Sequence, residues 1–416
     1  MKVLWFSNGI LSKETSTGSG SWLHAMRDLI SSEVSLVNIT ECRTDVSAIE
    51  CHNGNGIKEY LLPQWKLHNG VPSDENIQKM NSILIEEQPD LIHIWGIEKY
   101  WALLFGRNLI PFDKVLLEMQ GVAASVMDVY YGGLTPKECK KIKSIKSFLF
   151  PKQRLTALYS EAVENAKREV EIVSNFKSIA TQSDWTREQL SSICEENTKY
   201  FYSLRPIRSE FYKSAKWEDP INEHPVIYSS FSYYAPFKGT HILLKALSLL
   251  KRKYPGIVLN IAGPSFYGLP FYKGMDYGKY LSRLIDQLSL KDNIHFCGSL
   301  NASQITKEIL HADVVINPSF VESYSAAAAE ALYLGAPTVL AYAGAMVNFS
   351  NDCPVALYYN PMDYRSLASN TEELLVNSRK RDEFSSNAIK VMTHKADPER
   401  VKITQINTYE SVMLEK

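Results

Sequence analysis

The chain has 416 residues, of which 45% are hydrophobic and 22% are charged, and its formal net charge is −1. This length is sufficient for two domains of ordinary size, and the near-zero charge excludes the strong positive field that is typical of nucleic-acid-binding proteins. The six cysteines are scattered without Cys-x-x-Cys spacing, which indicates reduced cytoplasmic thiols and predicts neither a zinc site nor a disulfide framework.

The N-terminal segment is predicted to form a strand, a glycine-rich loop and a helix. Residues 2–7 form an apolar strand that is too short for a signal peptide, and the helical periodicity of residues 22–30 follows a loop containing Gly18 and Gly20. A loop of this kind can approach a phosphate, although an ordinary tight turn is an equally good interpretation. Leu23 occupies the third glycine position of the dinucleotide fingerprint, so a nicotinamide enzyme is not favoured.

Two later strands of the first half end in polar residues. The strand at 89–96 contains His93, whose apolar neighbours also suit a buried structural histidine, and the strand at 114–121 contains Gln120. A glutamine can orient hydroxyl groups through hydrogen bonds but cannot carry a proton as histidine does. Neither residue alone identifies a site.

The segment 137–154 is unusually basic, with one acid, Glu138, among seven lysines and arginines. An apolar stretch, 148–150, follows most of the lysines. A basic helix with an apolar end can lie on an anionic bilayer, and a solvated helical face beside a core anchor is the competing interpretation. The chain has no apolar run long enough to span a bilayer.

Helical and strand periodicity lapses near residues 218–223, where we place a domain boundary. The next elements are a strand at 226–231 and a helix at 241–253, with Lys238 at the junction before the helix. A lysine in this position can reach a diphosphate as a point charge, whereas a solvated lysine is the common alternative. Two further strands contain Gly263 and Phe296 near their ends.

Residues 317–341 are predicted to form a strand end, a loop, a helix and a second strand. Ser323 and Ser325 are candidate N-caps, and an alanine-rich run then favours a helix that ends at a glycine followed by a proline. Glu322 lies in the loop and Glu330 lies eight residues later on the helix. The amides of Ser325 and Ala326 lie at the positive end of the helix dipole, so the segment suits a phosphate at the amides and hydroxyl groups at the two carboxylates.

This segment resembles the retaining glycosyltransferases of family 4, which have the GT-B architecture. The resemblance depends on the Glu-x7-Glu spacing within two strings, Pro-Ser-x-x-Glu at 318–322 and Glu-Ala-x-x-x-Gly-x-Pro at 330–337. Other parts of the chain are similar to the same family: the Pro-Asp-x-x-His strand that contains His93, the Ser-Asp-Trp-Thr junction at 183–186, and the Lys-Gly pair that begins at Lys238.

The resemblance implies a nucleoside-diphosphate sugar, UDP- or GDP-linked, as the donor, and it implies a role for each matched residue. Lys238 and the helix amides at Ser325 and Ala326 would hold the diphosphate, Glu330 the ribose hydroxyls and Glu322 the donor sugar. The remaining donor contacts would come from Gly18, Gly20, Gly263 and Phe296, with His93 and Gln120 near the sugar or acceptor. Relatives usually have His where Gln120 stands and Arg where Tyr233 stands.

We therefore predict an α/β protein of GT-B type, with two doubly wound Rossmann-like domains facing a central cleft. The predicted ranges are 1–220 for the acceptor domain, 221–394 for the donor domain, and 395–416 for a helix that crosses back to the first domain. The sequence lacks Asp-x-Asp, so no metal and no cofactor are expected. The predicted function is transfer of a sugar to a hydroxyl acceptor, either a glycan or a lipid-linked glycan in surface polysaccharide synthesis. The enzyme would be cytoplasmic or peripheral at the inner face of a membrane.

Two alternatives remain open from the sequence. A sugar-nucleotide epimerase of the same fold would use the same nucleotide pocket but would need no acceptor. A non-catalytic protein that binds a sugar nucleotide is conceivable because of the departures at Gln120 and Tyr233.

Overall fold

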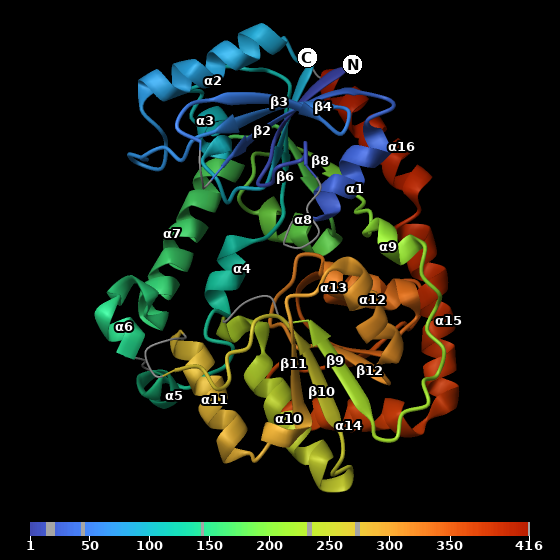
Figure 1. Ribbon diagram of the computed structural model, residues 1–416. Helices are drawn as coiled ribbons and strands as arrows, with labels where there is room; N and C mark the ends of the chain where they lie inside the picture. Colours follow the sequence, from blue (N-terminus) through green and yellow to red (C-terminus); the bar gives the residue numbers. More distant parts are fainter. Residues whose placement is uncertain (14–20, 43–45, 143–144, 231–234, 271–274, 415–416) are drawn as a thin grey trace. The chain divides into compact units, whose positions relative to one another are not determined.

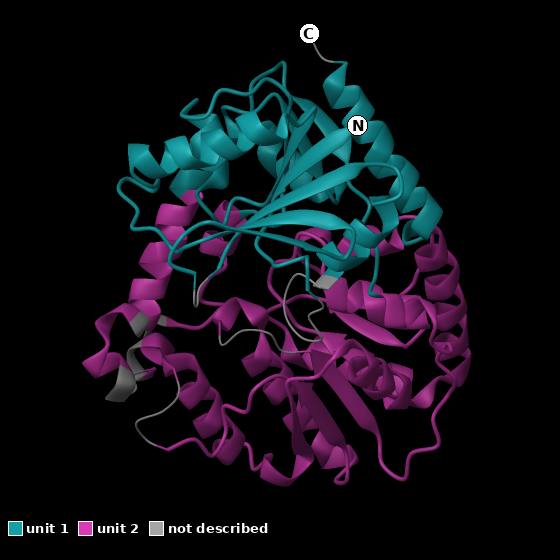
Figure 2. Cartoon of the chain, turned by 45° about the horizontal axis from the view of Figure 1, so that its top comes forward, with its two compact units in different colours: residues 1–122, 167–208, 395–416 teal, residues 123–166, 209–394 magenta. Residues whose placement is uncertain are grey.

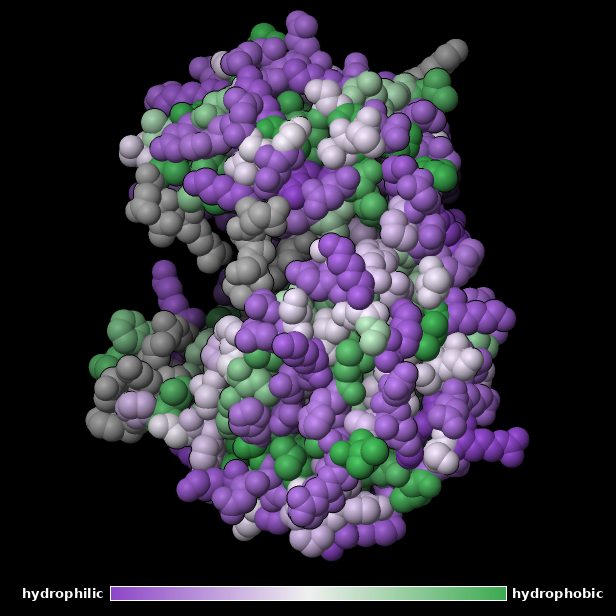
Figure 3. Space-filling view, turned by 45° about the vertical axis from the view of Figure 1, so that its right-hand side comes forward, coloured by the Kyte–Doolittle hydropathy of each residue, from purple (hydrophilic) through white to green (hydrophobic). Residues whose placement is uncertain are grey.

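A computed structural model describes residues 1–13, 21–42, 46–142, 145–230, 235–270 and 275–414, and they form two compact α/β units (Figure 1). The first unit contains residues 1–122, 167–208 and 395–416, and the second contains residues 123–166 and 209–394 (Figure 2). Among the described residues, no helix has both the length and the apolar character needed to cross a membrane. Hydrophilic side chains cover most of the face drawn in Figure 3.

The first unit is built on an eight-stranded sheet in the order β3-β4-β2-β1-β5-β6-β7-β8, with parallel pairing except between β3 and β4. Its strands are β1 (Lys2–Phe6), β2 (Ser35–Glu41), β3 (Glu50–Gly54), β4 (Ile57–Leu62), β5 (Leu91–Trp95), β6 (Val115–Glu118), β7 (Ser178–Thr181) and β8 (Lys199–Tyr202). Its helices are α1 (Ser21–Ile30), α2 (Asp74–Glu87), α3 (Trp101–Gly106), α8 (Asp184–Ser191) and α16 (Pro398–Met413).

Both faces of this sheet are covered, because successive side chains of each strand point to opposite faces. In β1, Leu4 and Phe6 enter the core beneath α2 and α3, whereas Val3 and Trp5 enter the core beneath α1 and α16. The C-terminal helix α16 therefore packs on the first unit, as predicted. A hydrogen bond of 3.0 Å from the Trp5 indole to the Tyr409 hydroxyl adds to this packing.

The second unit contains an all-parallel sheet in the order β11-β10-β9-β12-β13-β14. The strands are β9 (Val226–Ser230), β10 (Val258–Ala262), β11 (Ile294–Gly298), β12 (Val314–Asn317), β13 (Thr338–Ala341) and β14 (Leu357–Tyr359). The α-helices of its second segment are α9 (Ser209–Tyr212), α10 (Thr240–Lys253), α11 (Asp276–Gln287), α12 (Ala302–His311), α13 (Ala326–Leu334), α14 (Tyr364–Val376) and α15 (Ser378–Lys395). Short 3₁₀ turns occur at Pro236–Lys238, Lys291–Asn293 and Gly344–Ser350.

The observed division of the chain differs from the predicted ranges at residues 209–220 and, over a longer stretch, at residues 123–166. This segment carries α4 (Ala123–Asp128), α5 (Pro136–Lys141), α6 (Ile145–Leu149), a 3₁₀ turn (Pro151–Gln153) and the start of α7 (Leu155–Val173), and it belongs to the second unit. The carbonyl of Gly132 accepts a hydrogen bond from His241 over 2.9 Å, and the ring of Tyr130 lies 5.9 Å from that of Phe237. These contacts join residues far apart in sequence, which is why a boundary drawn from local composition missed them.

Candidate functional site

The predicted donor residues of the second unit gather at the switch point of its sheet. From β9 the chain runs outward through β10 and β11 on one side and returns to β12 on the other, so β9 and β12 are neighbours. Lys238 follows β9 and Glu322 follows β12, both at the carboxyl ends of parallel strands. In open α/β sheets, ligands bind at such a point.

The loops that follow β9 and β12 are fastened to each other. The backbone N–H of Phe320 donates to the carbonyl of Phe237 over 2.7 Å. Gly239 has φ of 73°, and a Cβ at this position would overlap the carbonyl oxygen of Pro318. Only glycine meets both requirements, so the Lys-Gly pair of the sequence motif has a direct steric cause.

Lys238 and Glu322 form an ion pair. The Lys238 Nζ lies 2.7 Å from the Glu322 Oε1, and the two side chains are 20% and 18% exposed. The backbone of Glu322 is held by a hydrogen bond of 2.7 Å from the amide of Ala345 to its carbonyl oxygen. Because the Glu322 carboxylate already holds the Lys238 side chain in one conformation, an anion that binds the ammonium does not have to order that side chain first.

The start of α13 provides a second group of donors. Ser325 is the N-cap with φ of 67° and ψ of 84°, and its hydroxyl accepts from the amide of Ala328 at 3.3 Å and from the Asn317 side chain at 2.7 Å. Ala326, the first helical residue, is exposed. The first amides of a helix have no partner within the helix and lie at the positive end of its dipole, so this end can receive a phosphate.

Glu330 lies within α13 on a face that is almost closed to solvent. Its side chain is only 5% exposed, and the neighbouring Ala329 and Ala331 are fully buried. Burying a carboxylate without a polar partner is energetically costly, so buried carboxylates usually have a hydrogen-bonding or ionic partner. Its predicted role as the partner of ribose hydroxyls remains a prediction.

Gly263 directly follows β10, the strand beside β9, and Phe296 lies within the edge strand β11. Gly263 has φ of 126°, and its amide donates to the carbonyl of Gly298 over 2.8 Å, which joins the two strand ends. Phe296 packs edge-on against Phe266, with ring centroids 4.9 Å apart. Gly263 therefore borders the same carboxyl edge of the sheet as Lys238, whereas Phe296 lies in the middle of its strand, and a contact of either residue with a nucleotide remains a prediction.

The structure corrects the prediction for His93. The imidazole has no exposed surface, and its Nδ1 lies 2.9 Å from the Tyr409 hydroxyl, so a sugar has no access to it. Burial lowers the pKa of His93 despite Glu118, whose Oε2 lies 3.8 Å from Nε2. His93 is a core residue that contacts α16 through Tyr409. This agrees with the alternative interpretation from the sequence, in which its apolar neighbours suit a buried structural histidine.

Gln120 lies beyond the end of β6, and its buried Nε2 has no hydrogen-bond partner in the structure. A contact of this donor with a sugar or an acceptor remains a prediction. Gly18 and Gly20 lie outside the described residues, as does Tyr233.

The sequence analysis missed a polar pair at the switch point of the first sheet, between β1 and β5. The Asn8 side-chain amide, after β1, lies 3.2 Å from the Glu98 carboxylate, after β5. Gly96 has φ of 92°, and a Cβ there would overlap the Glu98 carboxylate. Polar residues directly after neighbouring strands were the available signal, although the pairing of β1 with β5 becomes visible only in the sheet order.

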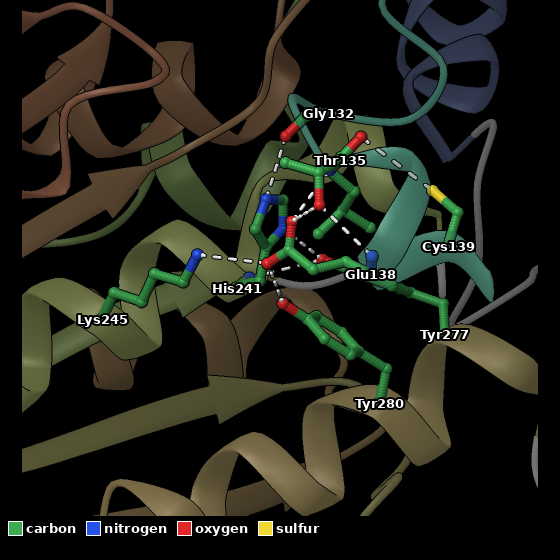
Figure 4. Close-up of polar contacts among 9 residues, drawn as sticks. Gly132, Thr135, Glu138, Cys139, His241, Lys245, Tyr277 and Tyr280 are labelled. Carbon is green, nitrogen blue, oxygen red and sulfur yellow. Dashed lines mark hydrogen bonds and ion pairs between the residues drawn. The ribbon is translucent and has the colours of Figure 1, made fainter. Parts of the chain in front are cut away.

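A buried histidine, His241, holds the start of α10, three residues after Lys238 in the sequence (Figure 4). His241 Nε2 donates to the carbonyl of Gly132 over 2.9 Å, and its Nδ1 lies 2.7 Å from the Tyr277 hydroxyl. The ring is parallel to that of Phe320, with centroids 6.1 Å apart. Burial lowers the pKa of His241 to about 3, assisted by the positive charge of Lys245, so the imidazole is neutral and acts as a structural anchor.

The sequence is similar to one family model and to several known proteins. Residues 212–391 match the family model described as glycosyl transferases group 1. The chain is 25% identical over 277 residues to an uncharacterized glycosyltransferase of Methanocaldococcus jannaschii, covering 62% of this chain and 67% of that protein. It is 33% identical over 111 residues to the D-inositol 3-phosphate glycosyltransferase of Mycolicibacterium smegmatis, covering 27% of this chain and 24% of that protein.

Solved structures resemble the whole chain in fold. Sucrose-phosphate synthase from Thermosynechococcus elongatus superposes with a TM-score of 0.74 at 14% identity, covering 99% of this chain and 98% of that chain. Anabaena HepE, solved in complex with UDP and glucose, gives a TM-score of 0.67 at 15% identity, covering 99% of this chain and 100% of that chain. The chain thus has two α/β units of GT-B type, and the second of them contains the residues, 212–391, that match the glycosyl transferases group 1 model.

Proposed function

We propose that this protein is a retaining, metal-independent glycosyltransferase of family 4 that moves a hexosyl group from a nucleoside-diphosphate sugar to a hydroxyl acceptor. The observation that carries the proposal is the ion pair of Lys238 and Glu322 at the switch point of the second sheet, beside the open start of α13. The family-model match covers this whole region. A glycan or a lipid-linked glycan of surface polysaccharide synthesis is the proposed acceptor.

The proposed mechanism depends on stabilisation of the departing diphosphate. As the bond between the donor sugar and the diphosphate breaks, negative charge grows on the phosphate oxygen that leaves. A fixed ammonium at Lys238 and the first amides of α13 oppose that charge in the transition state more than in the ground state. Glu322 would accept hydrogen bonds from the donor sugar, and Glu330 would accept them from the ribose.

Among the described residues, no group of three or more His, Cys, Asp or Glu side chains is arranged to hold a metal ion. The residues that fit the leaving group are instead Lys238 and backbone amides, and we propose that these perform the charge neutralisation alone. Activity measured with added EDTA tests this part of the proposal, because a metal-dependent transferase would stop.

The test of the function is a panel of UDP- and GDP-linked hexoses, beginning with UDP-glucose because the fold neighbour HepE was solved with UDP and glucose. Each donor is incubated with and without simple glycosides, and the release of free nucleoside diphosphate is followed. We expect at least one donor to be consumed, with an acceptor-dependent product whose anomeric configuration by NMR matches that of the donor. A new sugar nucleotide formed without acceptor would instead identify an epimerase, and binding without turnover would identify a non-catalytic binding protein.

A further inference from the structure

The corner formed by α6 and the 3₁₀ turn that follows it exposes three consecutive large apolar side chains. Phe148 is 76% exposed, Leu149 is 63% exposed and Phe150 is 54% exposed. Single exposed apolar residues are ordinary on a protein surface, but three in succession at a projecting corner form a contiguous patch. In Figure 1 the corner lies at the left edge of the view, beside α5 and the lower end of α7.

Hydrogen bonds within the second unit hold the corner in place, so its apolar side chains are not exposed merely because they lie on an unsupported loop. The Arg154 side chain donates to the carbonyl of Ser147 over 3.0 Å, across the turn. Ser147 and Leu155 are buried, and the amide of Leu155 donates to the carboxylate of Asp276 over 3.3 Å at the start of α11. The apolar residues therefore project from a fixed support and do not reach the core.

The basic side chains near the patch are exposed, whereas the acidic one is held by hydrogen bonds within the unit. Lys137, Lys152 and Arg154 are exposed. Glu138, the acid of this segment, is half-buried, and its carboxylate accepts from the amide and the hydroxyl of Thr135, both at 2.8 Å (Figure 4). The other side of that carboxylate faces Tyr280 at 3.3 Å.

The charge of Glu138 is thereby compensated within the unit. Burial acts to raise the pKa of this carboxyl, but the hydrogen bonds from Thr135 and the Lys245 ammonium at 3.9 Å outweigh it, so the pKa falls below its ordinary value. The outward charge of the corner is positive, and an apolar projection with a positive margin matches an anionic lipid surface, where side chains enter the acyl region while cations contact headgroups.

We propose that the corner at residues 145–154 docks this protein on anionic membranes through Phe148, Leu149 and Phe150, with Lys137 and Lys152 contacting lipid headgroups. This surface lies apart from Lys238 and Glu322 in the sequence, and the proposal does not require glycosyl transfer. A protein that binds vesicles but transfers no sugar would therefore refute the proposed function and leave the docking surface intact.

The test is co-sedimentation of the full chain with vesicles of phosphatidylcholine, alone or mixed with phosphatidylglycerol. We expect binding to the mixed vesicles at low salt, weaker binding at high salt because the charges are screened, and little binding to phosphatidylcholine alone. The double variant Phe148→Ser with Leu149→Ser should lower the partition coefficient at least about tenfold, since it removes most of the inserted apolar area.

Charge reversal tests the positive margin separately. Lys137→Glu with Lys152→Glu should weaken binding by at least about fivefold for each lysine removed. The matched controls lie elsewhere on the same unit: Ile221→Ser replaces a fully exposed isoleucine, and Arg379→Glu with Lys390→Glu reverses two exposed cations of α15. Both controls should bind vesicles as the unaltered protein does.

Two results would overturn the proposal. One is failure of the unaltered, folded protein to sediment with the mixed vesicles at low salt. The other is a change in oligomeric state: if Phe148→Ser with Leu149→Ser converts a dimer to a monomer in light scattering and leaves vesicle binding unchanged, the patch binds a second copy of the chain. Circular dichroism and the thermal midpoint verify that each variant is folded, which we expect because the altered side chains are exposed.

Discussion

Replacing Lys238 by alanine should lower kcat by roughly 100-fold or more, because the variant loses the cation that we propose stabilises the departing diphosphate. The ammonium lies 2.7 Å from the Glu322 carboxylate and is 20% exposed, so it is fixed but still accessible to a ligand. A unit charge about 4 Å from a developing negative charge contributes on the order of 4 kcal/mol at an effective dielectric constant near 20. Only part of that energy is specific to the transition state, and about 2.7 kcal/mol already corresponds to the 100-fold loss.

The same substitution should have little effect on folding. A partly exposed ion pair contributes at most about 1 kcal/mol, which in a unit of this size is a change of roughly 2–4 °C in Tm. Lys253→Ala is the matched control, since Lys253 is also ion-paired, to Glu372, and lies at the opposite end of α10. The 14-residue helix separates the two positions by about 20 Å.

The assay is donor consumption at saturating donor, with circular dichroism and thermal denaturation as controls for folding. Near-normal kcat in Lys238→Ala, with Lys253→Ala also normal, would refute the assignment and require a different cation at the diphosphate. Lys279 would be a weak replacement, because its ammonium already donates to the carbonyls of Leu269 and Pro270 at 3.0 and 2.9 Å.

Four further substitutions test other parts of the site. Glu330→Ala should weaken donor binding in calorimetry by about 1–3 kcal/mol, the range for hydrogen bonds to a charged group, and unchanged affinity in a folded variant would remove Glu330 from the site. Since the first unit is the predicted acceptor domain and Glu98 lies at the switch point of its sheet, Glu98→Gln should slow transfer to an acceptor by about tenfold and leave donor hydrolysis unchanged, and an equal loss in both reactions would contradict a contact of Glu98 with the acceptor. The pKa of His241 is about 3 in the folded chain against an ordinary 6.5, so unfolding takes up a proton below pH 6.5 and stability falls as the pH decreases toward 3. At pH 5 the loss is about 2 kcal/mol, and His241→Gln should show a smaller difference in unfolding free energy between pH 7.5 and pH 5 than the unaltered protein. Glu322→Gln should raise the affinity for the free nucleoside diphosphate, because Lys238 loses its partner, and should lower the preference for the sugar nucleotide; calorimetry with both ligands measures the ratio, and an unchanged ratio contradicts the pairing argument.

Local sequence patterns were sufficient to predict the elements around the donor site. The alanine run, the serine before it and the glycine after it predicted α13, and the structure places Ser325 as its N-cap and Gly335 at the left-handed C-cap with φ of 82°. The same local reasoning predicted that Lys238 precedes a helix. These features depend on residues within a few positions of one another, so a single sequence records them.

Features that depend on tertiary contacts could not be predicted in this way. His93 could be a core residue or a ligand contact until α16 was placed against β5, because Tyr409, its partner, lies 316 residues away. The pair of Asn8 and Glu98 required the order of the first sheet, and the assignment of residues 123–166 required the contact between Gly132 and His241. Long-range pairing has no local signature in composition or periodicity, which explains why these three inferences failed or were missing.

The ion pair of Lys238 and Glu322 changes the electrostatic argument for the donor site. The sequence predicted a lysine for the diphosphate and a glutamate for the sugar as separate contacts, but in the structure each charge neutralises the other. The amides at the start of α13 also carry partial positive charge, from the helix dipole, and Glu322 is paired with Lys238 instead of with them. We therefore expect these amides to attract a doubly charged diphosphate first. Under the proposed function, binding of the complete donor would exchange one ion pair for two charge-assisted contacts, with the phosphate at Lys238 and a sugar hydroxyl at Glu322. A nucleoside diphosphate without its sugar would supply only the first of these contacts, so the pair would favour the intact donor over the product and assist release of the product after transfer.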